Sequence, residues 1–372
     1  MARSLSVGQV RWLRMRAQRL SRPRAADGTA PRVVRDLGAV QAQDPAAAPL
    51  AVRARSTGLL AAGVRRAREE ERSIVRTWAM RYTLHLLAAE DVGWLLALLG
   101  PHLVRASARR REQLGLDEET CARAIRALRE VLAHRGPLTR AEIAEELAAR
   151  GIRLDGQARP HLLGRAALDG LICLGPDRDR QPTYVLLEDW VKPAPPLPRE
   201  EALAELARRY LAAHGPAGLS DFASWTGLPA ADARTGLEAV AGELTEVAVA
   251  GRPAWLPSAR AGWLDEPVPT DPVVRLLPAF DPYLLGWRDR SLIVSDEHVR
   301  DVHPGGGVIR PALLVTGRVA GTWRTRKRSG GLLVEVRPFG PLPAEVQAAL
   351  AAEAVDVGRF LGVQTTLRTA EP

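Results

Sequence analysis

A chain of 372 residues is too long for one small core, and its 46% hydrophobic content is typical of a globular protein rather than a disordered one. Its apolar runs are much shorter than the ~20 residues of a membrane helix, and its N-terminus lacks the apolar core of a signal peptide, so we expect a cytoplasmic protein without membrane contact. The net charge of +9 and the pI of about 10.5 indicate a polyanionic partner, although the preference for arginine over lysine can by itself reflect a GC-rich genome.

Residues 1–115 are predicted to start with helices and to continue into strands. Apolar residues at helical spacing indicate three helices, over residues 6–20, 31–43 and from 45 to 55. Residues 74–88 alternate between apolar and polar side chains, which is typical of a long strand or a hairpin. On such a strand, Arg81 and His85 share one face. We interpret this region as a divergent version of the modules that follow.

The middle of the chain contains a repeat of three helices followed by a hairpin. In residues 116–192 the elements follow in that order, and Thr139 is placed to cap the second helix. In residues 193–262 the same order returns, with Ser220 as the corresponding cap. A Gly-Pro dipeptide ends the first helix of each copy. This order is typical of winged-helix modules, and its repetition is more informative than either copy alone.

Short strands and glycine-rich turns dominate residues 263–372. Aliphatic and β-branched segments predict five strands, over residues 273–281, 291–296, 308–315, 318–326 and 332–338. The turns between them contain HPGGG, TG and RSGG, and a final helix is predicted over residues 342–362. The sequence therefore predicts an α+β fold, with three tandem winged-helix domains and a small C-terminal β-barrel, bounded as 1–115, 116–192, 193–262 and 263–372.

Common catalytic and cofactor signatures are missing from the sequence. It contains no P-loop, no zinc-protease motif, no serine-hydrolase elbow and no dinucleotide fingerprint. The glycines at 305–307 are not followed by a lysine, so they are predicted to form a hairpin tip. Cys121 and Cys173 lie in apolar patterns without a C-x-x-C pair and are predicted to be buried thiols. The seven histidines are scattered, so we expect no metal site and no cofactor.

The segment LGAVQAQDPAAAP has an unusual arrangement of polar residues. Gln41 and Gln43 lie two residues apart, and Asp44-Pro45 follows them directly. Because proline disfavours the helical conformation at the preceding residue, Asp44 is predicted to lie at a helix end. The two amides would then project from that helix end. Composition alone favours an exposed helix cap over a catalytic site.

Four segments of the chain, taken together, resemble one protein family. LGAVQAQD, RTWAMRYTLHLL, LLPAFDPYLLGWRDR and GRVAGTW are similar to segments of the AlkZ-type DNA glycosylases in the YcaQ-like winged-helix superfamily, in the same order. QAQ resembles the Gln-aliphatic-Gln pattern of the AlkZ branch rather than the Gln-x-Asp pattern of the YcaQ branch. The resemblance spans nearly the whole chain. It implies three winged helices and a β-barrel around a basic channel of DNA size, with Gln41 and Gln43 as catalytic residues.

Two glutamines suit the hydrolysis of a bond to a cationic leaving group. An amide does not titrate, but its carbonyl can accept a hydrogen bond from water and direct that water at C1′ of the sugar. This help suffices when a purine alkylated at N7 or N3 departs as a neutral base. Asp44 either stabilises the positive charge that develops on the sugar or caps a turn. The chain has only two lysines, Lys192 and Lys327, which favours a monofunctional enzyme that leaves an abasic site.

The second matching segment contains candidate contacts to DNA. A strand face with Arg76, Arg81 and His85 would suit backbone phosphates, and a solvated strand edge is the alternative. Family members carry glycine where this chain has Tyr82. The local backbone and the role of this tyrosine therefore depart from the family pattern.

The C-terminal region carries the densest positive charge of the chain. The basic tip consists of Arg324, Arg326, Lys327 and Arg328. We expect this tip to contact backbone phosphate, with a solvated hairpin as the alternative. His303 lies in a second loop that could probe a groove. Asp281 and the charged cluster at 288–290 are either structural ion pairs or DNA contacts.

The expected partner is double-stranded DNA with alkylated bases, and the chain is expected to act as a monomer. The resemblance implies that bulky natural-product adducts or crosslinks are plausible lesions, as for self-resistance enzymes of the AlkZ branch. Such lesions need an open site rather than a tight base-flipping pocket. A non-catalytic winged-helix regulator is the main alternative, because a fold alone does not establish catalysis. An RNA-binding scaffold is weaker, because side chains cannot read the deep A-form groove.

Overall fold

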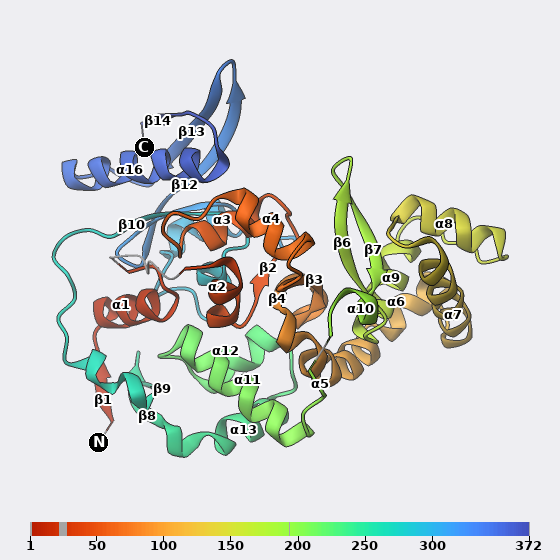
Figure 1. Cartoon of the computed structure of the whole chain (residues 1–372). Coiled ribbons are helices and arrows are strands. Elements are labelled where there is room, and N and C mark those ends of the chain that lie inside the picture. The colour runs from red at the N-terminus through yellow and green to blue at the C-terminus, as the bar shows by residue number, and fades with distance from the viewer. Residues whose placement is uncertain (1, 22–27, 193, 372) are drawn as a thin grey trace. The chain divides into compact units, whose positions relative to one another are not determined.

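The computed structural model describes residues 2–21, 28–192 and 194–371 (Figure 1). The chain forms two compact units. One unit consists of residues 66–202, and the other combines residues 1–65 with 203–372. Helices and strands alternate in both units, so the α+β prediction is confirmed.

In the unit of residues 66–202, one sheet has the strand order β4-β3-β6-β7-β5. Its strands are β3 (Ile74–Ala79), β4 (Thr83–Ala88), β5 (Leu138–Thr139), β6 (Ile172–Arg178) and β7 (Gln181–Leu186). Its helices are α5 (Val92–Ala106), α6 (Ala108–Gln113), α7 (Glu118–Arg135), α8 (Arg140–Ala149), α9 (Ala158–Leu168) and α10 (Leu187–Trp190). Thr139 caps α8 in a capping box with Glu142, as predicted. From α7 to β7, the elements follow the predicted order of three helices and a hairpin.

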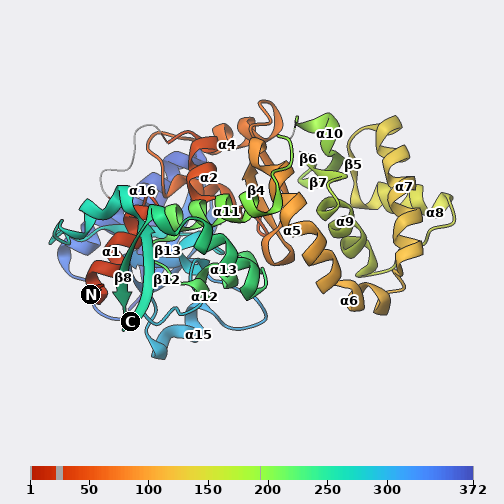
Figure 2. The same ribbon diagram turned by 90° about the horizontal axis from the view of Figure 1, so that it is seen from below.

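In the other unit, the first part of the chain packs with the third predicted module. Its helices are α1 (Val7–Ala17), α2 (Ala30–Leu37), α3 (Ala47–Arg53), α12 (Leu219–Thr226) and α13 (Ala230–Ala239), with most of α11 (Arg199–His214); α4 (Ala61–Glu69) crosses the unit boundary. Parallel pairing joins β1 (Arg3–Leu5) to β8 (Leu244–Val249), which pairs with β9 (Arg252–Pro257), and Figure 2 shows the N-terminus beside β8. Ser220 is not the cap of α12. Gly218 is the N-cap, and its N–H donates to the carboxylate of Asp221 at 3.0 Å.

The C-terminal part of this unit is an open sheet, not the predicted closed barrel. Its order is β10 (Val274–Leu277), β11 (Ala312–Val315), β12 (Arg318–Arg328), β13 (Gly331–Pro338) and β14 (Thr365–Thr369). Within the described residues, β10 and β14 are edges and do not pair with each other. Helix α16 (Ala344–Leu361) packs on β10 and β14 (Figure 1). Because Leu350 and Val357 of this helix bury the apolar face of the sheet, closure into a barrel is not needed.

Two details of the C-terminal prediction also differ from the structure. Residues 291–296 form turns instead of a strand, although Ile293 and Val294 are buried. Strand β14 was not predicted, and it lies parallel to β13 after α16. The turns at 316–317 and 329–330 connect neighbouring strands as predicted.

Two further sequence-based points concern burial and membranes. Cys121 and Cys173 are both buried and free, as predicted. Burial raises the pKa of each thiol above its usual value, so neither is an activated thiolate. Over the part of the chain that the structure describes, no helix combines the length and apolar character needed to cross a bilayer.

Candidate active site

The two glutamines lie on the extended connection between α2 and α3. Gly38, with φ of +72°, ends α2 after Leu37, and Val40–Gln41 then forms the short strand β2. The predicted helix over 31–43 is therefore wrong beyond residue 37, because the glycine takes a left-handed conformation that stops the helix. The amides do not project from a helix end.

The backbone is extended at Val40 and Gln41 and bends at Gln43. Successive side chains of an extended segment point to opposite sides. Val40 and Ala42 are buried, whereas Gln41 is half-buried and Gln43 is exposed. The apolar side chains thus anchor the segment, and the two amides are more accessible than their apolar neighbours.

Asp44 closes the turn that begins α3. Its carboxylate accepts hydrogen bonds from the N–H groups of Ala46 at 2.8 Å and Ala47 at 3.3 Å. Its backbone carbonyl accepts from Ala47 and Ala48. Of the two predicted roles, the structure shows the capping contacts directly. The carboxylate is half-buried, and Asp44 directly follows Gln43 in the chain.

Aromatic packing supports the segment at its upstream end. A Cβ on Gly38 would lie 3.5 Å from the ring of Trp225, so the turn rests on that indole. Trp225 belongs to a buried aromatic cluster: its ring centroid lies 5.3 Å from that of Tyr210 and 5.2 Å from that of His214. Tyr210 in turn stacks on His214 at 4.7 Å. Rings packed this closely leave little freedom for the end of α2.

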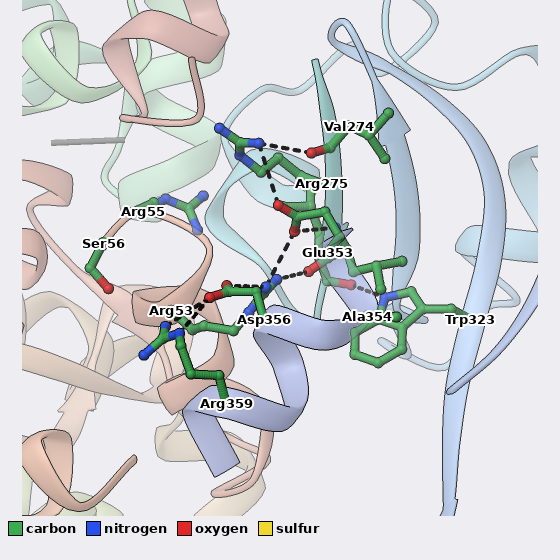
Figure 3. Close-up of polar contacts among 12 residues, drawn as sticks. Arg53, Arg55, Ser56, Val274, Arg275, Trp323, Glu353, Ala354, Asp356 and Arg359 are labelled. Atoms are coloured by element: carbon green, nitrogen blue, oxygen red, sulfur yellow. Dashed lines mark hydrogen bonds and ion pairs between the residues drawn. The ribbon is translucent and has the colours of Figure 1, made fainter. Parts of the chain in front are cut away.

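A buried ion network supports the segment at its downstream end. Arg53, at the end of α3, is fully buried and donates to the carboxylates of Glu353 at 3.2 Å and Asp356 at 2.8 Å on α16 (Figure 3). It also donates to the carbonyl of Leu276 on β10 at 2.7 Å. Arg275 adds a second cation to Glu353 at 3.4 Å. These contacts fix α3 to the C-terminal sheet and its helix, because buried charges are tolerated only when they are paired.

A second buried pair lies immediately after α3. The guanidinium of Arg55 donates to both carboxylate oxygens of Asp281 at 2.8 and 2.7 Å, and both side chains are fully buried. Arg55 also donates to the side chain of Gln18 at 2.7 Å. For Asp281, the structure shows the ion pair that was one of its two predicted roles. The sequence analysis did not single out Arg53 and Arg55, although two arginines in the apolar run AAPLAVRAR were a usable signal.

The predicted phosphate contacts of the other unit are mostly buried. Arg76 on β3 is 5% exposed and His85 on β4 is 3% exposed. Arg81 is half-buried and lies in the turn between the strands. The prediction that it shares a strand face with His85 is therefore wrong. Arg81 and Tyr82 have φ of +55° and +60°. A backbone in this left-handed region favours glycine, so Tyr82 adopts it at a steric cost.

Tyr82 compensates for its backbone conformation by packing within the same unit. Its hydroxyl donates to the carbonyl of His161 at 3.1 Å. A Cβ on Gly164 of α9 would lie 2.8 Å from that hydroxyl oxygen, so the tyrosine fills the space that this glycine leaves. The ring also lies 5.9 Å from the ring of His161. Tyr82 is thus a packing residue of this turn.

His85 makes the stability of the protein depend on pH. Burial, and secondarily the charge of Arg81, lowers the pKa of His85 to about 3, whereas an unfolded histidine titrates near ~6.5. The unfolded chain therefore binds more protons between these values. The contribution of His85 to the free energy of unfolding should be fully present above pH ~6.5. It should be lost as the pH drops towards 3, by at most about 1.4 kcal/mol per pH unit. Urea unfolding at a series of pH values measures this slope. A His85→Gln variant should flatten it, and equal slopes in both proteins would show that another group is responsible.

The basic tip on β12 has far more positive than negative charge. Its residues 324–328 are exposed. Glu335 pairs with Arg324 and Arg326, each at 2.7 Å, and also with Arg368. One carboxylate shared by three guanidinium groups leaves a net positive surface, which suits phosphate.

His303, unlike the basic tip, carries no positive charge at neutral pH. It is half-buried, and burial together with the charge of Arg290 lowers its pKa to about 4, so the ring is neutral at pH 7. The neighbouring glycines at 305–307 all have positive φ and form an exposed loop. Within the described ranges, no group of three His, Cys, Asp or Glu side chains is arranged to hold a metal ion.

Comparison with known proteins identifies the family of this chain. Residues 34–360 match the family described as DNA glycosylase AlkZ-like. The chain is 31% identical over 312 residues to the interstrand DNA cross-link repair glycosylase of Streptomyces sahachiroi, which covers 78% of this chain and 80% of that protein. The solved structure of Streptomyces sahachiroi DNA glycosylase AlkZ superposes with a TM-score of 0.80 at 30% identity, over 99% of this chain and 100% of that one. The protein therefore belongs to the AlkZ-like DNA glycosylase family and is a DNA repair hydrolase that acts on N-glycosyl bonds, as predicted.

Proposed function

We propose that this enzyme excises cationic alkylated purines, above all N7-alkylguanine, from duplex DNA, with Gln41 and Gln43 as its catalytic residues. The observation that carries the proposal is the placement of two accessible neutral amides on a short segment whose two ends are fixed. A fixed segment can orient water without a large entropic cost at the moment of reaction.

The reaction needs no strong acid when the base is already positively charged. The amide carbonyls accept hydrogen bonds from a water molecule, whose oxygen bonds to C1′ as the C1′–N9 bond breaks. The electron pair of that bond passes to the purine and cancels its positive charge, and the water proton leaves to solvent. The amide dipoles, with Asp44 nearby in the chain, stabilise the oxocarbenium character of the sugar. A neutral purine lacks this driving force.

Bulky natural-product adducts and crosslinks are the lesions that we favour, which would give the enzyme a role in antibiotic self-resistance. The relative from Streptomyces sahachiroi is named as an interstrand cross-link repair glycosylase. Gln43 is exposed rather than enclosed, which suits a lesion too large for a closed pocket.

Exposure divides the candidate DNA contacts into two groups. We propose direct phosphate contacts for the exposed tip, which includes Arg324, Arg326, Lys327 and Arg328, and for the half-buried Arg81. Arg76, His85 and His303 are buried, uncharged or both, so we assign them to shaping these surfaces.

The domain organisation is also a proposal. We favour winged-helix modules over 116–192 and 193–262, because each contains three helices followed by a hairpin. We also favour a winged helix over 1–115. We further favour an enzyme that works as a monomer, since one chain holds both glutamines and the basic tip.

Selectivity for a charged base tests the proposed function. Duplexes carrying one N7-methylguanine, one hypoxanthine or one uracil are incubated with the enzyme, and abasic sites are revealed by heating in alkali. We expect release of N7-methylguanine at least about 100-fold faster than release of either neutral base, because a difference of about 2.7 kcal/mol in the barrier is well within the effect of leaving-group charge. Similar rates on all three duplexes would refute water positioning by amides as the main source of catalysis.

A further inference from the structure

A second group of arginines gathers away from the basic tip, within the unit that holds the glutamines. They line a hollow of ≈ 550 Å³ bounded by α1, α2, α11 and the turn at 258–264. We call this feature the arginine hollow; its arginines are Arg16, Arg19, Arg32, Arg35, Arg209 and Arg260. Asp36 is the single carboxylate among its lining residues.

Most of these guanidinium groups are held in place. The side chains of Arg16 and Arg19 are only 18% and 13% exposed. The guanidinium carbons of Arg16 and Arg260 lie 4.2 and 4.7 Å from the ring centroid of Trp263, so one indole orients two cations. Cations fixed in this way lose little entropy when they bind an anion.

Among the residues that line the arginine hollow, positive charges outnumber negative ones. Two carboxylates outside the lining also pair with its arginines: Glu266 with Arg16 at 2.5 Å and Glu205 with Arg209 at 2.7 Å. Asp36, within the lining, is shared between Arg19 and Arg32, the latter at 3.0 Å. Arg260 donates to the carbonyl of Ala212 and, among the described residues, has no carboxylate partner. Burial lowers the pKa of Arg260, which reflects the cost of keeping this cation out of water. Like charges collected at such a cost are typical of a site that an anion completes.

We propose that the arginine hollow binds a phosphate group of the DNA backbone, at a position separate from the basic tip. This inference rests on the proposed action on duplex DNA. A volume of ≈ 550 Å³ is much larger than a free phosphate ion requires, whereas a phosphate with its flanking sugars would fill more of it. Arg32 and Arg35 are exposed, so they stand where a long polymer can reach them.

The salt dependence of DNA binding tests the proposal. The variant is Arg32→Gln with Arg35→Gln, since both residues are exposed and the Arg19–Asp36 pair remains. The matched control is Arg234→Gln, an exposed arginine on α13. Affinity for an undamaged duplex is measured by fluorescence anisotropy at several salt concentrations. Thermal unfolding of each variant checks that the fold is kept.

We expect the slope of log Kd against log salt to fall by about 1 in the double variant, because each neutralised phosphate contributes ~0.9. The Arg234→Gln control should keep the wild-type slope. An unchanged slope in the double variant overturns the inference. Calorimetry with inorganic phosphate forms a second arm, and phosphate binding that the double variant loses without any change in slope would assign the hollow to free phosphate, which also overturns it. A wild-type protein that does not bind duplex DNA would overturn both this inference and the proposed function.

Discussion

Replacing Gln41 and Gln43 together by alanine is expected to lower the rate of N7-methylguanine release at least about 100-fold. The loss corresponds to about 2.7 kcal/mol of transition-state stabilisation, which is typical of removing preorganised dipoles from a reacting centre. Because Gln43 is exposed and the segment is anchored by Val40 and Ala42, the fold should be unaffected. Single-turnover release from a duplex with one lesion measures the effect.

The matched control is Gln347→Ala, which removes an exposed glutamine on α16. This variant should keep the wild-type rate. Duplex affinity of the double variant should stay within about twofold of wild type, since amides contribute little to the electrostatic part of binding. A double variant that releases the base as fast as wild type would move catalysis to other residues, and an equal loss of binding and rate would indicate a binding role instead.

Replacing Asp281 by alanine is expected to lower the free energy of unfolding by about 3–5 kcal/mol, because it leaves the buried guanidinium of Arg55 without its counterion. Both side chains are fully buried and share two hydrogen bonds. The carboxylate also accepts from the N–H of Tyr283 at 2.9 Å, so the change removes a cap as well. The midpoint of urea unfolding reports the loss.

Two further variants interpret this result. Glu243→Gln disrupts an exposed pair with Arg208 and should cost less than about 1 kcal/mol, since surface ion pairs are weak. Arg55→Met combined with Asp281→Leu removes both buried charges and should recover part of the stability lost in Asp281→Ala. If the double replacement is no more stable than Asp281→Ala, the uncompensated charge is not the cause of the loss.

Local signals in the sequence correctly predicted helices α7 and α8. Thr139 and Glu142 form a capping box within four consecutive residues, and the amphipathic stretch that becomes α7 is likewise contiguous. The predicted cap of α12 was wrong. The N-cap is Gly218, which has no side chain, and the side chain of Asp221 accepts a hydrogen bond from its N–H. The start of α12 depends on the hydrogen bond between the N–H of Gly218 and Asp221, three residues later. In the sequence, Ser220 was an equally good candidate for the N-cap.

Long-range packing was the main source of error. The open edge of the C-terminal sheet depends on α16 covering it and on β14 joining β13 in parallel, and neither pairing leaves a mark in the strands themselves. At the site, the order Gln41, Gln43, Asp44 was readable, but the partners that support the segment were not. Trp225 and Glu353 lie far from it in sequence, and only the fold brings them to Gly38 and Arg53.

The pairing of Arg53 with Glu353 joins residues 300 positions apart. During synthesis, Arg53 leaves the ribosome 300 residues before Glu353, so this buried cation lacks that partner until α16 has emerged. A chain cut before α16 would lack both Glu353 and Asp356 and would leave the buried cation of Arg53 without these counterions. Anchoring of the segment that holds the two glutamines therefore waits for a helix synthesised long after it.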